Sequence, residues 1–168
     1  MTAPLPEPQE QVLSLAPLTV RRRVRWSECD PAGVVYAGKF PDYMITAVGQ
    51  LRAHVLNAPL VQAGVPSFNT PGKALSMVFL SPLWPDDVFD MSVYLGGIGR
   101  STVHFLVAAT RADTGLPVFA GRLSSIYVEP GNRLKVTPVP EPHRATLDAY
   151  AGQCPAHPDF LNHLDFAV

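Results

Sequence analysis

The chain has 168 residues, of which 47% are hydrophobic and 16% charged, and this predicts one globular domain rather than a disordered chain. The formal net charge of -1 argues against a nucleic-acid or anionic-membrane partner, and no apolar run reaches the roughly 18 residues of a membrane span. The first residues lack the pattern of a secretion signal, and two cysteines are too few for a disulfide framework, so a cytoplasmic protein is expected.

Both ends of the chain are rich in proline. Residues 1–17 carry four prolines and little apolar periodicity, which predicts a flexible or extended arm. Residues 141–168 are expected to form a second tail, in which Arg144–Tyr150 can form a short helix. The folded domain is therefore expected to span residues 18–140.

The first regular elements are a strand and a long helix. Thr19–Trp26 alternates, with apolar residues and Arg22 on one face and the other three arginines on the opposite face, which is typical of a half-buried strand. Apolar residues then recur at helical spacing over residues 40–55, and Pro41 is tolerated in the first turn. Residues 57–59 are expected to end this helix, the longest in the chain.

The second half of the chain is predicted to be β. Runs rich in Val, Phe, Leu, Ile and Tyr are separated by turn signals. We expect successive strands to pair as an antiparallel meander. Because one helix cannot cover both faces, the sheet is expected to wrap around the helix, with another subunit covering the remaining face. The predicted strands are Ala74–Leu80, Val88–Leu95, Thr102–Thr110 and Leu116–Val128.

The joint between the first strand and the helix, WSECDPAGVVYAGKF, raises the question of what Asp30 does there. Residues 30–33, Asp-Pro-Ala-Gly, fit an ordinary β-turn. A carboxylate at this joint also lies beside a helix N-terminus, whose free N–H groups can stabilise an oxyanion, and it can act as nucleophile or general base. Glu28 is predicted to be a solvated charge at the strand end, and a second carboxylate near the site is the alternative. The residues alone leave both interpretations of Asp30 open.

Other patterns carry weaker signals. Gly96-Gly97-Ile98-Gly99 is predicted to be a hairpin turn rather than a phosphate loop, although Arg100 follows it. Ser124-Ser125 lacks the nucleophile elbow of a serine hydrolase. The thiolate of Cys29 is disfavoured beside Asp30, and the scattered histidines do not indicate a metal site.

The segment VRWSECDPAGVVY, residues 24–36, resembles the opening motif of the 4-hydroxybenzoyl-CoA thioesterase family. Two later stretches add to the resemblance, FLSP with Asp86-Asp87 and IGRS at residues 98–101, and it covers about residues 18–140. It implies the α+β hotdog fold, in which an antiparallel sheet wraps one long central helix. It also implies an acyl-CoA thioesterase without a cofactor, apart from the CoA of its substrate. Active sites at subunit interfaces are implied too, hence a homodimer or homotetramer.

The resemblance assigns roles position by position. Asp30 matches the catalytic aspartate, Tyr36 the aromatic residue near the acyl group, and Ala37 the position whose backbone N–H binds the thioester carbonyl. Arg100 falls where the family places a basic residue against the CoA phosphates. The positions implied to bind substrate or CoA are Gly33, Val34, Arg100 and Ser101.

Three positions depart from the family pattern. Many members carry His or Tyr in place of Ala37 and Asn in place of Lys39, so the oxyanion role rests here on the backbone N–H alone. Ile45 stands where members often have an acid that recognises a substrate hydroxyl. This disfavours hydroxybenzoyl-CoA and favours an unsubstituted aromatic or medium-length acyl group.

Two alternatives remain from the sequence. One is a non-catalytic hotdog protein that binds acyl-CoA or acyl carrier protein. The other is a hotdog dehydratase, which is weaker because such enzymes usually need a histidine at the active helix, whereas His54 lies near its far end.

Overall fold

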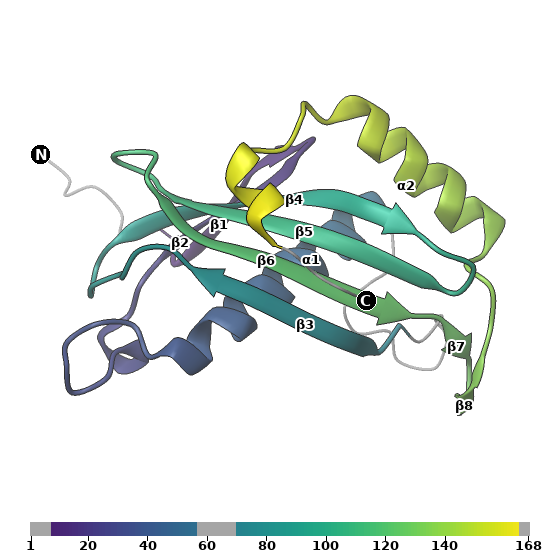
Figure 1. Cartoon of the computed structure of the whole chain (residues 1–168), viewed down its shortest axis with the longest axis horizontal. Helices are drawn as coiled ribbons and strands as arrows, with labels where there is room; N and C mark the ends of the chain where they lie inside the picture. Colours follow the sequence, from purple (N-terminus) through teal and green to yellow (C-terminus); the bar gives the residue numbers. More distant parts are fainter. Residues whose placement is uncertain (1–7, 57–69, 165–168) are drawn as a thin grey trace, which may run out of the picture.

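A six-stranded antiparallel sheet carries the fold, in the order β1-β2-β4-β5-β6-β3 (Figure 1). The computed structural model describes residues 8–56 and 70–164. A short β7–β8 pair extends beyond β6. The strands are β1 Glu10–Leu15, β2 Leu18–Arg23, β3 Gly72–Phe79, β4 Val88–Ile98, β5 Thr102–Arg111, β6 Pro117–Ile126, β7 Val128–Glu129 and β8 Asn132–Val136.

Helix α1, Phe40–Val55, lies against one face of the sheet and is seen behind it in Figure 1. The expected bounds of this helix are confirmed; the segment 57–59, expected to end it, lies outside the described residues. One side of α1 is apolar and contacts β2, β4 and β6, which forms the main core. Its buried residues are Phe40, Tyr43, Met44, Ala47, Val48 and Leu51.

The contact between α1 and β6 depends on Gly121. A Cβ placed on Gly121 would lie 2.3 Å from the sulfur of Met44. Met44 is fully buried, so its side chain has little room to move away. The absence of a side chain at Gly121 therefore lets the helix approach the sheet closely.

Helix α2, Glu141–Gln153, packs against α1 and β4. Its Tyr150 hydroxyl accepts the backbone N–H of Leu18 at 2.8 Å and donates to the carbonyl of Val93 at 2.5 Å. Burial raises the pKa of this hydroxyl far above its ordinary value. These two bonds fasten α2 to the paired β2 and β4, so the expected helix in this tail is longer than Arg144–Tyr150 and part of the core.

The opposite face of the sheet is partly covered by the chain itself. The 3-10 helix η3, Asp159–His163, crosses in front of the central strands in Figure 1. Leu161 and Leu164 form a second apolar cluster there with Tyr94 and Ala120. The chain itself therefore covers part of the face that was expected to be covered by another subunit.

Two sequence-based expectations about the strands are wrong. Glu10–Leu15, assigned to a flexible or extended arm, forms β1 and pairs with β2. Strand β3 pairs with β6 and not with β4. The 80–87 connection leads from β3, at one edge of the sheet, past β6 and β5 to β4. There Val24 donates to the carbonyl of Asp87. Strands β4, β5 and β6 do form the expected meander.

Candidate active site

The loop after β2 is closed by backbone pairing. A 3-10 helix, η1 (Trp26–Glu28), follows the strand, and Cys29 then pairs with Val35 as an antiparallel bridge. Within this bridge, the N–H of Asp30 donates to the carbonyl of Val34 at 2.9 Å. The bridge makes residues 29–35 a small rigid loop with Asp30 at its base.

Asp30 has a structural role in the turn formed by residues 30–33. The N–H of Gly33 donates to the Asp30 carbonyl at 2.9 Å, and the N–H of Ala32 donates to Asp30 Oδ1 at 2.8 Å. Gly33 has φ of +81°, a left-handed conformation that favours glycine. The predicted β-turn is therefore confirmed. Within the described residues Asp30 Oδ2 has no hydrogen-bond partner, so one carboxylate oxygen is available for chemistry.

The other arm of the loop leads directly into the helix. Tyr36 is followed by a 3-10 turn, η2 (Ala37–Lys39), which continues into α1. In this turn the N–H of Lys39 donates to the Tyr36 carbonyl at 2.8 Å. The N–H groups of Ala37 and Gly38 precede it and have no acceptor in the described part of the chain. They are the free donors that an oxyanion needs.

The Tyr36 side chain is also placed by this turn. Its ring lies against Gly38, where an added Cβ would come within 2.5 Å of a ring carbon. The side chain is 57% exposed, so it borders the surface beside the free N–H groups. The Tyr36 ring therefore lies beside the turn that carries the free N–H groups.

An apolar cavity of about 290 Å³ opens beside the start of the helix. The rings of Phe40 and Phe79 meet there at 5.1 Å between centroids. The hydroxyl of Ser81 donates to the Pro117 carbonyl at 2.7 Å, so this lining hydroxyl is already engaged. This volume suits an acyl group and is too small for a whole CoA ester, since small-molecule sites measure roughly 300–1,000 Å³. The lining residues are Val35, Ala37, Phe40, Phe79, Leu80, Ser81 and Pro82.

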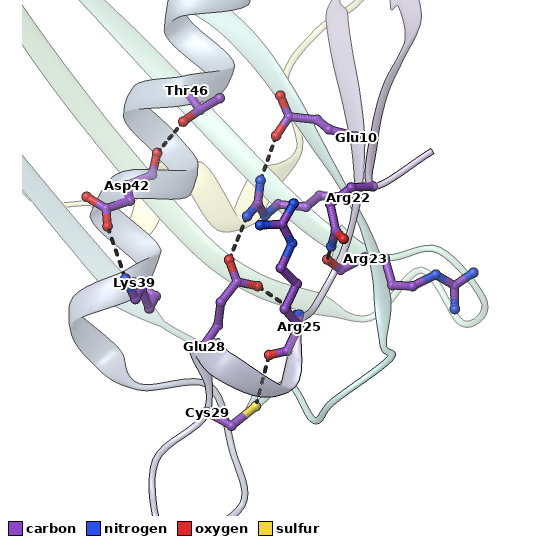
Figure 2. A network of polar contacts seen from close by, with 10 residues as sticks. Glu10, Arg22, Arg23, Arg25, Glu28, Cys29, Lys39, Asp42 and Thr46 are labelled. Atoms are coloured by element: carbon purple, nitrogen blue, oxygen red, sulfur yellow. Dashed lines mark hydrogen bonds and ion pairs between the residues drawn. The ribbon is translucent and has the colours of Figure 1, made fainter. Parts of the chain in front are cut away.

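Glu28 is not the solvated charge that the sequence predicts. It is 9% exposed, and its carboxylate accepts Arg22 Nη2 at 2.6 Å and the N–H of Arg25 at 2.8 Å (Figure 2). Burial by itself would raise the pKa of Glu28, but these hydrogen bonds outweigh burial and hold the pKa below its ordinary value. Arg22, which interrupts the apolar face of β2, points inward and explains why the acid is buried.

Arg100 and Ser101 do not meet the other predicted residues within one chain. They form the turn before β5, whereas Phe40 packs against Phe119, which pairs with Ala109 near the other end of β5. At about 3.3 Å per residue, the stretch of β5 from Thr102 to Ala109 is roughly 23 Å long. The structure thus places Asp30 on one arm of the loop and Tyr36 and Ala37 on the other, and it leaves the basic residue at the far end of the sheet.

Comparison with known protein families identifies the family of this chain. Residues 24–147 match the sequence model of the thioesterase-like superfamily. The chain belongs to the thioesterase-like superfamily. No curated protein matches it.

Solved structures show that this thioesterase-like chain has the hotdog fold. A thioesterase superfamily protein from Jannaschia has a TM-score of 0.72 at 21% identity, over 93% of this chain and 100% of its own. A 1,4-dihydroxy-2-naphthoyl-CoA thioesterase from Synechocystis has a TM-score of 0.66 at 18% identity, over 77% and 94%. A thioesterase from Thermus thermophilus, complexed with coenzyme A and Zn, has a TM-score of 0.68 at 22% identity, over 83% and 98%. At these identities the likeness establishes the fold alone.

The remaining sequence motifs of this thioesterase-like protein have structural explanations. Residues 96–99 belong to the β4–β5 hairpin, as predicted. Burial raises the pKa of the Cys29 thiol, and the neighbouring charge of Asp30 raises it further, so its thiolate is disfavoured. Ser124 is buried and bonds His104 Nδ1 at 2.7 Å on a strand, not on an elbow.

The described residues contain no cluster of three or more His, Cys, Asp or Glu side chains that could hold a metal ion. Within the same residues, none of the helices has the length and apolar content needed to cross a membrane.

Proposed function

We propose that this protein hydrolyses an acyl-CoA thioester to the free acid and CoA. The observation that carries the proposal is the loop closed by Cys29 and Val35. It holds the Asp30 carboxylate on one arm and the free N–H of Ala37 on the other, and Val35 and Ala37 also line the apolar cavity. A carboxylate, oxyanion donors and an acyl-sized cavity are the parts that thioester hydrolysis requires. Membership of the thioesterase-like superfamily supports the same chemistry.

In the proposed reaction the thioester carbonyl oxygen accepts the N–H of Ala37. In one route Asp30 attacks the carbonyl carbon, the C–S bond breaks, the CoA thiolate leaves and is protonated by water, and water hydrolyses the resulting mixed anhydride. In the other route Asp30 takes a proton from water as that water attacks the carbonyl carbon. After repeated turnover in ¹⁸O-labelled water, label in the Asp30 carboxylate would establish the first route with water attacking the Asp30 carbonyl of the anhydride, because the second route leaves both Asp30 oxygens unexchanged.

The lining of the cavity points to the acyl group. Phe40, Phe79 and Leu80 offer aromatic and aliphatic surface, and a substrate hydroxyl would find no charged partner among the lining residues. Ile45, at the position where relatives often carry an acid, is 50% exposed on α1 and is not part of this lining. An unsubstituted aromatic or medium-chain acyl group therefore fits better than a hydroxylated one.

The carrier is proposed to be CoA, bound with the help of a second copy of the chain. Strand β3 is an edge strand with exposed apolar residues, Leu75, Val78 and Phe79. Such an edge favours pairing with another strand. Antiparallel pairing of two β3 strands about a two-fold axis places the start of one strand beside the end of the other. The Arg100 end of the second copy then lies toward the cavity of the first, where its guanidinium can bind a CoA phosphate.

The function is tested by mixing the purified protein with a panel of aromatic and aliphatic acyl-CoA and acyl carrier protein esters and measuring free thiol. Release of thiol from apolar acyl-CoA esters is expected, with weaker activity on hydroxylated ones. Binding of CoA esters without thiol release would contradict hydrolysis and indicate a binding protein. For the assembly, light scattering is expected to give two or four chains, and Val78→Lys to give monomers with lower activity. A wild-type monomer with full activity would contradict the shared site.

A further inference from the structure

Glu28 is tied to three other parts of the chain by one ionic network (Figure 2). Arg22, on β2, donates to Glu28 Oε1 through Nη2 at 2.6 Å and to Glu10 Oε2, on β1, through Nη1 at 2.7 Å. The second oxygen of Glu28 accepts the N–H of Arg25 at 2.8 Å. Both carboxylate oxygens of Glu28 are therefore used, one by Arg22 on β2 and the other by the backbone of Arg25 at the start of η1.

The same network reaches the helix. The Arg22 guanidinium lies over the ring of Tyr43, on α1, at 4.6 Å from the ring centroid. Burial, and after it the charge of Glu28, raise the pKa of the Tyr43 hydroxyl far above its ordinary range, so this hydroxyl stays protonated. Arg22 thus connects β1, β2, the loop and α1 through a single side chain.

The backbone of Glu28 fixes the opposite arm of the loop. Its carbonyl accepts the N–H of Tyr36 at 3.0 Å, immediately before Ala37. The next residue, Cys29, makes the bridge to Val35. Glu28 therefore has a side chain anchored to Arg22 on the sheet and a backbone carbonyl that binds the arm with the free N–H groups, while the next residue on its own arm, Cys29, leads to Asp30.

We propose that Glu28 is a positioning residue, which sets the distance between the Asp30 carboxylate and the Ala37 N–H and does not touch the substrate. This inference rests on the proposed function and adds a residue to its machinery. The carboxylate is held by short charge-assisted hydrogen bonds within the structure, where such bonds are strong and directional. A displacement of about 1 Å between reacting groups can lower a rate about 100-fold, so an anchor at this place has a catalytic effect.

Glu10 provides a matched comparison. It bonds the same guanidinium at nearly the same distance, but it lies on β1, and its other oxygen accepts Gln50 Nε2 of α1 at 3.5 Å. Glu28→Gln is expected to lower kcat roughly 10- to 100-fold, with a change in KM below about threefold. Glu10→Gln is expected to leave kcat within about twofold of the wild type. Equal losses in the two variants, or unchanged kcat in Glu28→Gln, would overturn the positioning role.

A second measurement does not depend on activity. The amide hydrogens of residues 30–36 are expected to exchange faster in Glu28→Gln than in the wild type and in Glu10→Gln. If the wild type released no thiol from any ester, the proposed function would fail, whereas unchanged exchange in Glu28→Gln would overturn the positioning role. Should Glu28→Gln not fold, Arg22→Lys serves instead, since an ammonium cannot donate to both carboxylates in the geometry of the guanidinium. It is expected to show the same fall in kcat and the same faster exchange, and their absence would overturn the role.

Discussion

Cys29 and Val35 face each other as an antiparallel bridge, and this pairing holds together the two arms of the loop that carries the proposed chemistry. Asp30 follows Cys29 on the first arm, and Ala37 comes two residues after Val35 on the second. Backbone hydrogen bonds join the two arms, from the Asp30 N–H to the Val34 carbonyl at 2.9 Å and from the Tyr36 N–H to the Glu28 carbonyl at 3.0 Å. Changes to either group are therefore expected to alter the reaction while preserving the fold.

Replacement of Ala37 by proline removes the proposed oxyanion donor and little else. Ala37 is the first residue of a helical turn, where proline is well tolerated, and Tyr36 before it has the extended conformation that proline requires. Loss of one such donor is expected to lower kcat about 100- to 1,000-fold. The measurement is thiol release at saturating acyl-CoA, together with thermal unfolding to verify the fold.

Ala37→Ser is the control for this change, since it keeps the N–H and adds only a hydroxyl. It is expected to retain near-normal kcat. If Ala37→Pro folds and hydrolyses at the wild-type rate, the carbonyl is not bound at this N–H.

Gly121→Ala tests the packing of the central helix. The new Cβ would meet Met44 in the core, so overpacking is expected to lower the free energy of unfolding by about 1–3 kcal/mol. Gly152→Ala makes the same chemical change on α2 where nothing lies within 4 Å, and it is expected to stabilise the protein slightly. Urea denaturation of both variants measures the difference, and equal midpoints would show that Gly121 is not needed for the close approach.

Acid sensitivity tests the buried ion pair of Glu28. Its pKa in the folded protein lies below the ordinary value, so its ionised form stabilises the fold at neutral pH, and this stabilisation is lost as the pH falls through the folded pKa. Near neutral pH, Glu28→Gln is expected to be about 2 kcal/mol less stable than the wild type. This difference is expected to shrink as the pH falls from about 5 to about 3. Urea midpoints across this range check it, and a difference independent of pH would argue against an ionised Glu28.

Local patterns in the sequence predict the elements that are defined by local interactions. The apolar spacing over residues 40–55 gives the bounds of α1, and Asp30 with Gly33 gives the turn that the structure contains. The order of β4, β5 and β6 follows from short turns. The partner of β3 does not, because its pairing with β6 joins residues far apart in the sequence.

The buried charges are missed for a related reason. The inward-facing residues of β1 are Glu10, Val12 and Ser14, whereas Leu13 and Leu15 are exposed, so the strand lacks an apolar face that a sequence pattern can reveal. Because β1 is not predicted from the sequence, the pairing of Glu10 with Arg22 is not predicted either, and Glu28 is then assigned as a solvated acid. The sequence does contain one indication of the buried ion pair. Arg22 is a charged residue on the apolar face of a strand, and such a residue requires a buried partner.

The most direct test of the account is the rate of Asp30→Asn with the best acyl-CoA ester. Asparagine keeps the side-chain oxygen that accepts the Ala32 N–H, so the turn and the unfolding temperature are expected to stay nearly unchanged. Asp148→Asn, on the exposed surface of α2, controls for the loss of one negative charge. We expect kcat to fall at least about 100-fold in Asp30→Asn and to stay unaltered in Asp148→Asn. A folded Asp30→Asn that releases thiol as fast as the wild type would contradict it.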